Sequence, residues 1–400
     1  MALIRVHSLV GRNVIRLSRE YTRGAGLPGI DASNLVVAKT SSPKPLPVME
    51  GLVFGSQFSD HMLDCDWDAT NGWHAPKIVP YGNLTISPAA MCLHYAIQCF
   101  EGMKAYKDKS GNVRLFRPDC NMERINNSMK KLYLPQVDSS QMIELIKELL
   151  KLDQRWVPEG DGFSLYLRPA AIATDPYLGL QVVNQCKFFV ITSPVGPYYP
   201  EGFKPLKLFA DDENVRAWPG GSGNSKVGGN YGSTIAPQMA AHEHGCAQVL
   251  WLYPEVNPST SEEDFLVTEV GSMNLFVVIK SKDSNFTELV TAPLTDGTIL
   301  PGVTRRSILD LARGKGDLVV SERKLYMSEV VEAGREGRLV EAFGAGTAAV
   351  IAPVKAIAYK GKDIDFPTGE EIGPVAKSMW DQLTDIQYGR VDHPWSVLID

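Results

Sequence analysis

The most informative segment of the chain reads Arg216-Ala217-Trp218-Pro219-Gly220-Gly221-Ser222-Gly223-Asn224-Ser225-Lys226-Val227-Gly228-Gly229-Asn230-Tyr231-Gly232. Its one lysine, Lys226, lies among six glycines. Because glycine has no Cβ and adopts backbone dihedrals that other residues avoid, a ligand can approach such a loop to backbone distance. The composition therefore indicates that the loop presents Lys226 to a bound molecule.

Three interpretations of Lys226 are compatible with this loop. A phosphate-binding P-loop requires glycine directly before the lysine and Ser or Thr directly after it, whereas here Ser225 precedes and Val227 follows. A glycine-rich structural turn could carry the lysine incidentally. The third interpretation, which the sequence favours, is a covalent lysine whose amine forms a Schiff base with a carbonyl compound, most simply pyridoxal phosphate.

The length, composition and charge of the chain limit the classes of protein to which it can belong. With 400 residues, of which 44% are apolar and 22% charged, the chain is long enough for two domains with substantial cores. A formal net charge of −6 argues against non-specific nucleic-acid binding, which depends on clustered Lys and Arg. The longest apolar runs, such as residues 348–354, are far shorter than the ~20 residues of a membrane span. We expect small-molecule substrates, no nucleic acid and no membrane.

The cysteine and histidine patterns predict no metal site. The six cysteines contain no C-x-x-C pair and are Cys65, Cys92, Cys99, Cys120, Cys186 and Cys246. We expect buried thiols in a reducing compartment, not a disulfide framework. His242 and His244 flank Glu243, but residues two apart on a helix face different directions, so joint metal ligation is not expected.

The first 30 residues differ from the rest. Five arginines precede residue 31 with a single acid, Glu20, and the apolar residues among them could form one helix face. This pattern is typical of a mitochondrial presequence and predicts the mitochondrial matrix; a basic tail on a cytoplasmic enzyme is the alternative. Residues 31–50, rich in Ser and Pro, are expected to form an unstructured linker.

The remaining pattern predicts an α/β fold of the α+β type with two domains. Three prolines and two glycines within residues 193–202 mark the boundary. We expect a smaller N-terminal α/β domain at 51–196, an interdomain loop at 197–206 and a larger C-terminal cofactor-binding domain at 207–400.

Hydrophobic periodicity predicts the individual elements. Helices are expected to begin after Pro118 and after Pro301-Gly302, and to lie at 141–156, 233–244, 327–335 and 372–388. Strands are expected at 85–86, 113–116, 164–174, 187–192, 206–210, 248–253, 265–270, 275–279 and 318–321.

Pyridoxal phosphate chemistry needs an acid that keeps the ring nitrogen protonated. Glu269 is a charge inside an otherwise apolar strand pattern. A buried carboxylate costs several kcal/mol unless it is paired, and a pyridinium is such a partner. A strand-edge glutamate that faces water is the alternative reading of the same pattern.

The phosphate group needs N–H donors, which helix N-termini provide. Residues 301–305 (Pro-Gly-Val-Thr-Arg) have the form of such a helix start. Residues 344–348 (Gly-Ala-Gly-Thr-Ala) form a second candidate, a glycine turn with a hydroxyl. Both are also compatible with plain turns, and the residues alone do not distinguish them.

Seven ordered motifs make the chain similar to a known family. They are Phe100-Glu101-Gly102-Met103-Lys104-Ala105-Tyr106, Leu115-Phe116-Arg117-Pro118, Leu165-Tyr166-Leu167-Arg168-Pro169, Val249-Leu250-Trp251-Leu252-Tyr253, Thr268-Glu269-Val270-Gly271, Leu300-Pro301-Gly302-Val303 and Gly346-Thr347-Ala348. Together with the lysine loop they resemble the branched-chain amino acid aminotransferases of the fold-type IV pyridoxal phosphate family, over about residues 50 to 392. This subfamily is favoured over the D-amino acid aminotransferases and aminodeoxychorismate lyases, which share the fold.

The resemblance implies roles at the cofactor. Lys226 would form the Schiff base and then carry the proton between the substrate Cα and C4′ of the cofactor. Glu269 would pair with the pyridine nitrogen, and Tyr231 would hydrogen-bond the phenolic oxygen. The phosphate would be held by a bidentate arginine and by backbone and hydroxyl groups, namely those of Arg124, Val303, Thr304 and Thr347. Arg216 would support the residues that hold the cofactor without contacting the cofactor itself.

The resemblance also implies a substrate site. The residues at the substrate carboxylate would be Tyr95, Arg168 and the backbone of Thr347 and Ala348. The side-chain pocket would be lined by Phe54, Tyr166 and Tyr198, with Leu180 reaching in from a second subunit of a homodimer. Glutamate must enter the same pocket, and its γ-carboxylate would need Arg168 or tyrosine hydroxyls, since apolar walls alone reject a charge.

Two features, at three positions, depart from the animal members of the family. Those members carry a C-x-x-C pair where this chain has Ala349 and Ala352, so that thiol switch cannot operate here. Ser272 stands where they have threonine, which keeps the hydroxyl, and we expect its role at the cofactor to be retained.

The sequence thus predicts a homodimeric transaminase that exchanges amino groups between Leu, Ile or Val and 2-oxoglutarate by a ping-pong mechanism. One alternative is a fold-type IV aminotransferase with broader specificity for aromatic or Met-type substrates. A nucleotide-binding P-loop protein and a catalytically inactive scaffold are the others; the residues around Lys226 speak against the first, and the retained lysine, arginine, glutamate and tyrosine against the second.

Overall fold

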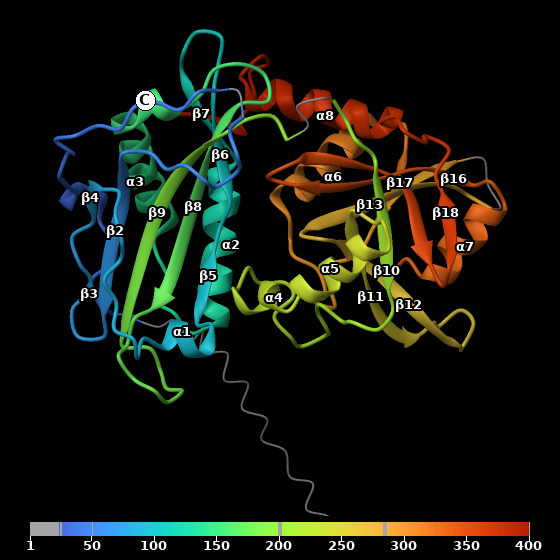
Figure 1. Cartoon of the computed structure of the whole chain (residues 1–400), viewed down its shortest axis with the longest axis horizontal. Coiled ribbons are helices and arrows are strands. Elements are labelled where there is room, and N and C mark those ends of the chain that lie inside the picture. Colours follow the sequence, from blue (N-terminus) through green and yellow to red (C-terminus); the bar gives the residue numbers. More distant parts are fainter. Residues whose placement is uncertain (1–23, 25, 50, 199–201, 283–285, 400) are drawn as a thin grey trace, which may run out of the picture.

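The computed structural model describes residues 24, 26–49, 51–198, 202–282 and 286–399. Two β-sheets lie side by side in this part of the chain, the first formed largely by the N-terminal half and the second by the C-terminal half (Figure 1). Helices pack against both sheets. This combination confirms the predicted α+β class.

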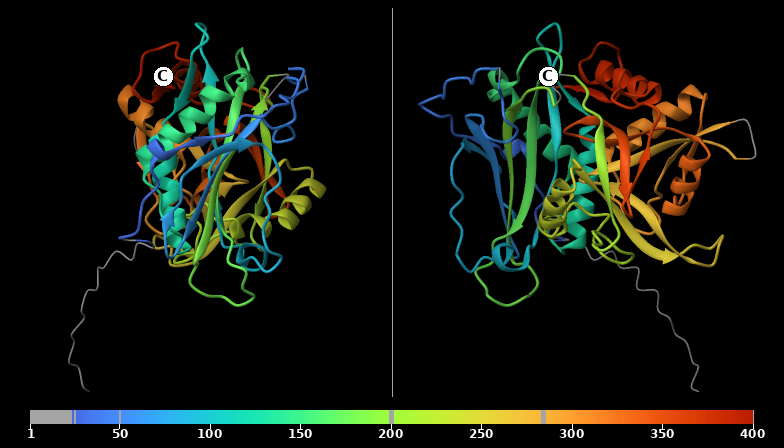
Figure 2. Two further views of the ribbon diagram at one scale, coloured as in Figure 1. Left: turned by 90° about the vertical axis from the view of Figure 1, so that its left-hand side faces the viewer. Right: turned by 45° about the vertical axis from the view of Figure 1, so that its right-hand side comes forward.

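The first sheet has ten strands and packs against two amphipathic helices. Its order is β1-β4-β2-β9-β8-β6-β7-β19, with β3 beside β2 and β5 beside β8. The strands are β1 (Val36–Val37), β2 (His61–Asp68), β3 (Gly72–Trp73), β4 (Lys77–Pro80), β5 (Gln98–Phe100), β6 (Met103–Lys107), β7 (Val113–Phe116), β8 (Ser164–Ala173), β9 (Gln185–Val195) and β19 (Ser396–Leu398). Helices α2 (Pro118–Lys131) and α3 (Ser139–Leu152) lie beside each other against this sheet (Figure 2). A short helix, α1 (Met91–Tyr95), precedes β5.

Helix α3 illustrates how local sequence positions these elements. The carboxylate of its N-cap, Asp138, accepts hydrogen bonds from the backbone amides of Ser140 and Gln141. It thereby satisfies two of the N–H groups that a helix start leaves free. The side chains that repeat at helical spacing and are buried against the sheet are Met142, Leu145, Ile146, Leu149 and Leu150.

The second sheet has nine strands in the order β12-β11-β10-β17-β16-β13-β14-β15, with β18 beside β17. Because β12 also pairs with β13, the first six strands of this order close into a ring. The strands are β10 (Leu206–Asp211), β11 (Gln248–Val256), β12 (Glu263–Val270), β13 (Met273–Lys280), β14 (Thr287–Thr291), β15 (Val319–Glu322), β16 (Leu339–Gly346), β17 (Val350–Tyr359) and β18 (Lys362–Asp365). The helices packed around it are α5 (Ile235–Glu243), α6 (Val303–Lys315), α7 (Met327–Arg335) and α8 (Pro374–Gln387).

The two halves share a hydrophobic cluster and a strand. Tyr106 and Phe116 of the first half are buried in the same cluster as Leu383 and Ile386 of α8. The chain then returns to the first sheet, where β19 pairs antiparallel with β7. Residues 396–398 therefore lie in the sheet of the first half, which the predicted division at 207–400 does not anticipate. The other domain boundaries stay a prediction.

The glycine loop lies between the sheets and is fixed to β5. The Lys226 carbonyl accepts a hydrogen bond from the Phe100 amide at 3.0 Å, and the Gly228 amide donates to the Gln98 carbonyl at 2.9 Å. A Cβ on Gly228 would lie 2.8 Å from the Gln98 side chain, so glycine here permits the close contact. The short helix α4 (Gly229–Gly232) follows, at the boundary between the halves (Figure 1).

Most predicted elements are present, several with shifted ends. The helix at 327–335 and the strand at 113–116 have the predicted bounds. The helix predicted at 141–156 begins earlier, at Ser139, and ends at Leu152, before a 3-10 turn at Gln154–Trp156. The strand predicted at 85–86 is wrong, because residues 82–87 have no regular structure. Two β-branched residues favour a strand only where a partner strand is available.

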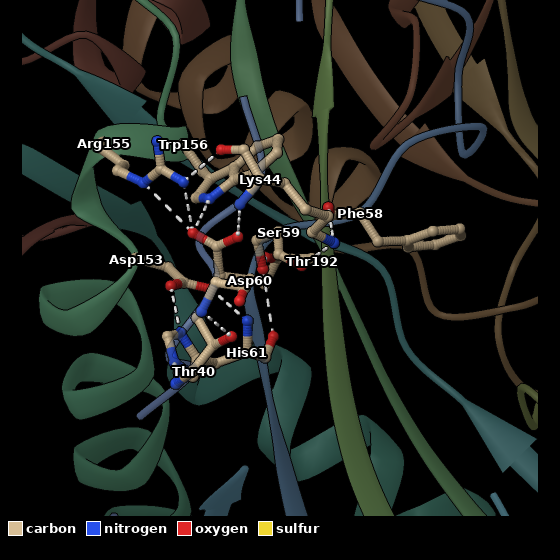
Figure 3. Close-up of polar contacts among 11 residues, drawn as sticks. Thr40, Lys44, Phe58, Ser59, Asp60, His61, Asp153, Arg155, Trp156 and Thr192 are labelled. Carbon is tan, nitrogen blue, oxygen red and sulfur yellow. Dashed lines mark hydrogen bonds and ion pairs between the residues drawn. The ribbon is translucent and has the colours of Figure 1, made fainter. Parts of the chain in front are cut away.

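Residues 31–49 are packed on the first sheet, contrary to the predicted unstructured linker. They include a 3-10 helix, Ala32–Asn34, and strand β1, which pairs parallel with β4. The Lys44 ammonium donates to the carbonyls of Phe58 and Ser59 at 2.7 and 2.6 Å (Figure 3). Composition did not indicate these contacts because backbone groups, which every residue carries, make many of them.

The predicted presequence falls almost entirely outside the described residues. Of residues 1–30, only 24 and 26–30 are described. Ile30 is buried in the first core cluster, and the Pro28 carbonyl accepts a hydrogen bond from the Trp73 amide at 3.0 Å. The described end of this segment is therefore part of the folded protein.

The six cysteines are buried free thiols, as their distribution predicts. Among the described residues, no group of His, Cys, Asp and Glu side chains is arranged to hold a metal ion. Over those same ranges, none of the helices has both the length and the apolar character required to cross a bilayer.

Candidate active site

A cavity of about 370 Å³ lies where the two halves meet, and the glycine loop forms part of its wall. The predicted site residues that line it are Phe54, Arg124, Tyr166, Arg168, Tyr198, Lys226, Tyr231, Glu269, Ser272, Val303, Thr304, Thr347 and Ala348. The fold thus brings residues from both halves of the chain to one cavity.

Lys226 is held by its backbone and by an aromatic neighbour. Its amide donates to the Ser128 hydroxyl of α2 at 2.8 Å. Its ammonium donates to the Tyr231 hydroxyl at 3.1 Å and lies 4.8 Å from the centroid of the Phe100 ring. Burial, together with the positive charge of Arg124, lowers the pKa of Lys226 to about 8. A lysine in this state supplies a nucleophilic free amine near neutral pH.

Glu269 is buried on β12, so the alternative of a water-facing strand edge is wrong. Its Oε2 forms an ion pair with Arg216 Nη2 at 2.6 Å. Its Oε1 accepts hydrogen bonds from Asn274 Nδ2 at 3.0 Å and from the Leu300 amide at 2.8 Å. Burial raises the pKa of Glu269, and the charge of Arg216 and the Leu300 amide oppose this rise. The site therefore holds a fixed carboxylate that a further cation would stabilise.

Arg124 is buried on α2 beside Glu101. Its Nε and Nη2 donate to the two Glu101 carboxylate oxygens at 2.6 and 2.8 Å, and its Nη1 donates to the Pro301 carbonyl at 3.1 Å. A guanidinium has five N–H donors, so two remain on the terminal nitrogens. The ion pair with Glu101 fixes the plane of the guanidinium and leaves those two donors for an anion.

The N-terminus of α6 forms the neighbouring wall. Its N-cap, Gly302, has no capping side chain. The first amides of the helix, which include those of Val303 and Thr304, therefore donate no hydrogen bond to a capping side chain. A Cβ on Gly302 would lie 2.1 Å from Asn274 Oδ1, which explains glycine at this position. Uncapped amides at a helix start are suited to binding an anion.

Ser272 occupies the tight turn between β12 and β13, next to Gly271. Gly271 has a φ of 55°, and a Cβ there would lie 2.2 Å from Gln248 Oε1. Glycine adopts this left-handed conformation at low cost. The turn therefore sets the position at which Ser272 lines the cavity.

The wall of the cavity formed by the first sheet contains Arg168 of β8, whose guanidinium lies over the rings of Phe100 and Tyr166. Arg168 Nη2 donates to the Tyr166 hydroxyl at 3.0 Å, and the guanidinium lies 4.7 Å from the centroid of Phe100. Arg168 Nε is buried without a hydrogen-bond partner. The Phe54 ring contacts Tyr166 edge to face at 4.8 Å. This part of the cavity offers apolar walls together with a cation that is not neutralised by a carboxylate of the cavity wall.

Three predicted residues do not line the cavity. Arg216 lies behind Glu269, as the predicted supporting position requires. Tyr95 is 41% exposed at the end of α1, and its hydroxyl donates to the Leu178 carbonyl. Leu180 is 73% exposed in the loop between β8 and β9. Within one chain, therefore, Tyr95 and Leu180 do not reach the cavity that contains Lys226.

Sequence reasoning missed Glu101 and Asn274, which hold Arg124 and Glu269 in place. Glu101 is fully buried, and Asn274 also donates to the Leu300 carbonyl at 2.9 Å. Each is a polar residue in an otherwise apolar segment, which is the signal that indicated Glu269. Applied to every such residue, the same criterion would have found both.

Comparisons with known proteins agree with this geometry. The amino-transferase class IV family matches residues 98–357. The branched-chain-amino-acid aminotransferase of Dictyostelium discoideum is 50% identical over 388 residues, which cover 96% of this chain and 99% of the relative. The mitochondrial one of Schizosaccharomyces pombe is 46% identical over 388 residues, with 95% and 88% covered. The cytosolic one of Mus musculus is 46% identical over 367 residues, with 92% of each covered.

Solved structures show the same fold. The branched-chain amino acid aminotransferase of Escherichia coli matches with a TM-score of 0.66 and 23% identity, over 85% of this chain and 99% of that structure. The one from Thermobaculum terrenum, solved in its PLP form, matches with a TM-score of 0.66 and 20% identity, over 85% and 98%. The chain therefore belongs to the class IV aminotransferase family.

Proposed function

We propose that this protein is a branched-chain-amino-acid aminotransferase, which reversibly transfers the amino group between L-leucine, L-isoleucine or L-valine and 2-oxoglutarate. The names of relatives that match over nearly the whole chain support this proposal. The observation that carries it is the position of Lys226, whose pKa is lowered to about 8, in one cavity with Glu269 and the start of α6. An amine, an acid and an anion site in one cavity are what transamination requires.

The cavity residues fit pyridoxal phosphate. When bound, this cofactor supplies an electron sink for the charge that forms when a bond at the substrate Cα breaks. Lys226 would hold its aldehyde carbon, Tyr231 its phenolic oxygen and Glu269 its ring nitrogen. The phosphate would be held by the two free N–H groups of Arg124, the first amides of α6 and the Thr347 hydroxyl.

Lys226 would also move the proton. An amine with a pKa near 8 can accept a proton from the substrate Cα and would deliver it to C4′ of the cofactor within the same turnover. The Tyr231 hydroxyl, 3.1 Å from Nζ, keeps the amine in the cavity. Glu269 would keep the ring nitrogen protonated, because a cation beside a buried carboxylate is stabilised more than a neutral ring.

The two substrates would share one pocket. The amides of Thr347 and Ala348 would bind the carboxylate common to all of them. The rings of Phe54, Tyr166 and Tyr198 would enclose a branched side chain and exclude water. For glutamate, the unpartnered Arg168 Nε offers a donor for the γ-carboxylate. One pocket then accepts both an apolar and an anionic side chain.

We infer a homodimer from the exposed apolar surface around α1 and the loop between β8 and β9. The apolar residues exposed there are Leu93, Tyr95, Tyr177, Leu178, Leu180 and Val182. An apolar patch of this kind is typical of a protein interface. A second copy that covers it would bring Tyr95 and Leu180 to the cavity of its partner.

We also propose the mitochondrial matrix as the location, because of the arginine-rich residues 1–23. The named relatives include both mitochondrial and cytosolic proteins. Since Pro28 and Ile30 belong to the folded part, processing would occur before Pro28. N-terminal sequencing of the protein purified from mitochondria tests this: a mature start beyond Pro28 contradicts it.

The visible absorption spectrum tests the central proposal. The purified protein with pyridoxal phosphate is expected to show the band of lysine-bound cofactor, and excess leucine is expected to shift it to the amino form of the cofactor. A Lys226→Ala variant is expected to show neither the band nor the shift. A wild-type protein without the band, or with a band that leucine does not change, would contradict the proposal.

A further inference from the structure

Lys104 is a buried lysine without a carboxylate partner. It lies on β6, is 8% exposed, and donates a hydrogen bond from Nζ to the Ala348 carbonyl at 2.8 Å, across 244 residues of sequence. Burial alone lowers its pKa to about 8, and no acidic group of the described chain contributes. Burying an ammonium without a counterion is unfavourable, so an uncharged side chain at this position would give a more stable folded state.

The carbonyl that Lys104 holds belongs to a strained turn. Residues 347–349 connect β16 to β17, and β17 begins at Val350, which is buried with a φ of 61°. A β-branched residue in the left-handed region is a genuine outlier that persists only where the surroundings impose it. The charged hydrogen bond from Lys104 on β6 stabilises this turn, and it comes from neither of the two strands, β16 and β17, that the turn connects.

Lys104 reaches this turn from behind the cavity that contains Lys226. It is paired with Tyr166 across β6 and β8, so both side chains lie on one face of the first sheet. A second cavity of about 110 Å³, lined by Lys104, Ser164 and Gln387, shares Tyr198 and Ala348 with the main cavity. The turn at Ala348 therefore separates Lys104 from the main cavity.

The geometry of one peptide unit links the contact with Lys104 to the wall of the main cavity. The Ala348 carbonyl and the Ala349 amide belong to one peptide unit, and in a trans peptide they point in opposite directions. The structure has no cis peptide bond among its described residues. With the carbonyl held by Lys104 behind the turn, the Ala349 amide is directed away from Lys104, and Ala349 lines the main cavity.

We propose that Lys104 is a positioning residue for the substrate carboxylate: by holding the Ala348 carbonyl it fixes and polarises the turn that carries the Thr347 and Ala348 amides and the neighbouring Ala349 amide, and the bound carboxylate supplies the negative charge that Lys104 lacks. This inference rests on the proposed aminotransferase function. It explains why a costly buried ammonium stands at this position, since its charge acts on every substrate that carries a carboxylate. Lys104 itself does not touch the substrate.

Two matched probes separate positioning from a structural role. 4-Methylvaleric acid has the leucine side chain and a carboxylate but no amine, whereas 3-methylbutylamine has the same side chain and an amine but no carboxylate. Lys104→Met is expected to weaken binding of the acid to the holoenzyme about tenfold, the typical loss of a charged hydrogen bond. It is expected to raise KM for leucine to a similar extent and to leave the slow half-reaction with the amine unchanged.

Two further variants complete the comparison. Lys104→Arg keeps the charge and is expected to retain most of the affinity for the acid. Ser164→Ala removes a hydroxyl of the same small cavity that has no hydrogen-bond partner, and is expected to behave as wild type. An unchanged affinity in Lys104→Met, or an equal loss with both probes, would overturn the proposal. A wild-type spectrum that leucine does not alter would instead refute the aminotransferase function itself.

The pH dependence gives a test that does not require Lys104→Met to fold. Since an ammonium is lost above its pKa, wild-type affinity for the acid is expected to fall as pH rises through about 8, more steeply than in Lys104→Arg, whose guanidinium stays charged. The titratable groups that line the small cavity beside Lys104 are Tyr106, Tyr198 and Tyr388. Burial raises the pKa of Tyr106 and, to about 12, that of Tyr388. Both stay neutral in this range. Parallel pH profiles of wild type and Lys104→Arg would overturn the proposal.

Discussion

Buried ion pairs hold the charged side chains at and behind the cavity in place. In the sequence, Lys226 and Glu269 are conspicuous because each is a charged residue in unusual surroundings. Lys226 lies in a glycine-rich loop, and Glu269 lies in an otherwise apolar strand. Their partners were harder to find, since the ion pairs of Glu269 with Arg216 and of Arg124 with Glu101 join residues distant in sequence. No local pattern encodes which distant residue a buried charge will meet.

The ion pair between Arg216 and Glu269 is expected to matter most in the absence of cofactor. Arg216→Met leaves the buried Glu269 carboxylate without its cation, which typically costs about 3–5 kcal/mol. We expect a marked decrease in the melting temperature of the apoprotein. The decrease should be smaller after addition of pyridoxal phosphate, because ligand binding stabilises the folded state and a protonated ring nitrogen replaces the lost cation.

Arg306→Met provides the control for this measurement. Arg306 is 57% exposed and lies 3.7 Å from Glu123, a contact that is worth little in water. Thermal unfolding of the two variants, with and without cofactor, should separate a buried from a surface ion pair. Equal melting temperatures for both variants would show that Arg216 does not stabilise Glu269.

The reactivity of Lys226 is expected to follow its titration. Only the neutral amine attacks an aldehyde, and the pKa of Lys226 is lowered to about 8. The rate at which the apoprotein takes up pyridoxal phosphate should therefore rise with pH up to about 8 and then level off. Stopped-flow absorbance between pH 6 and 10 measures this profile. Below the pKa, the rate should change roughly tenfold for each pH unit. A rate that still rises near the pKa of an ordinary lysine would contradict the assignment.

At the scale of elements, helices were predicted more reliably than the connections between them. The helix at 327–335 has a strong apolar period and was found with its ends. Residues 31–49 were missed because they are held by single polar contacts and not by a periodic apolar face. The Thr40 amide, for example, donates to His61 Nε2 at 2.9 Å, and the Lys44 amide donates to Asp60 at 2.9 Å (Figure 3).

Asp60 is the centre of this attachment. Its carboxylate also accepts hydrogen bonds from Arg155 at 2.6 Å and from the Trp156 indole at 2.9 Å. Burial raises the pKa of Asp60, but the hydrogen bonds from Trp156, the Lys44 amide and Arg155 outweigh it and lower the pKa overall. A lowered pKa means that this stabilisation is present above about pH 4 and is lost as pH falls through the folded-state value.

Asp60→Ala is expected to destabilise the protein by about 3 kcal/mol, because it leaves several donors without their acceptor. Urea unfolding at pH 7 measures the loss. Asp363→Ala is the control: Asp363 is an exposed partner of Lys207 at 2.6 Å and should cost at most about 1 kcal/mol. The difference between the two variants should shrink at pH 3. A difference that is independent of pH would show that the Asp60 carboxylate is not the stabilising group.

At the scale of the whole molecule, the sequence predicted the α/β fold class but not how the second sheet closes into a ring. Strand β12 pairs with β13 and closes the ring, and strand β19 returns to pair with β7. The hydrophobic patterns of these four strands do not indicate which strand each will pair with. Strand partners are set by the global packing, which local periodicity does not contain. The same limit applies to Tyr95, which was predicted at the substrate carboxylate but does not line the cavity of its own chain.

The proposed homodimer predicts that each cavity is completed by the other chain. Lys226→Ala and Tyr95→Ala should each be inactive or nearly so as homodimers. In a mixed dimer, one cavity contains both substitutions and the other contains neither. Random assembly of equal amounts should therefore recover roughly a quarter of the wild-type activity, because half of the dimers are mixed and each has one intact cavity.

Co-expression with two different affinity tags isolates the mixed dimer and makes the measurement direct. The purified mixed dimer is expected to have about half of the wild-type activity per dimer, since one of its two cavities is intact. Lys226→Ala mixed with Glu269→Ala is the matched control: Lys226 and Glu269 line the same cavity of one chain, so every mixed dimer has a defect in both cavities and should stay inactive. A Tyr95 mixed dimer that forms but remains as inactive as this control would show that Tyr95 does not serve the cavity of the partner.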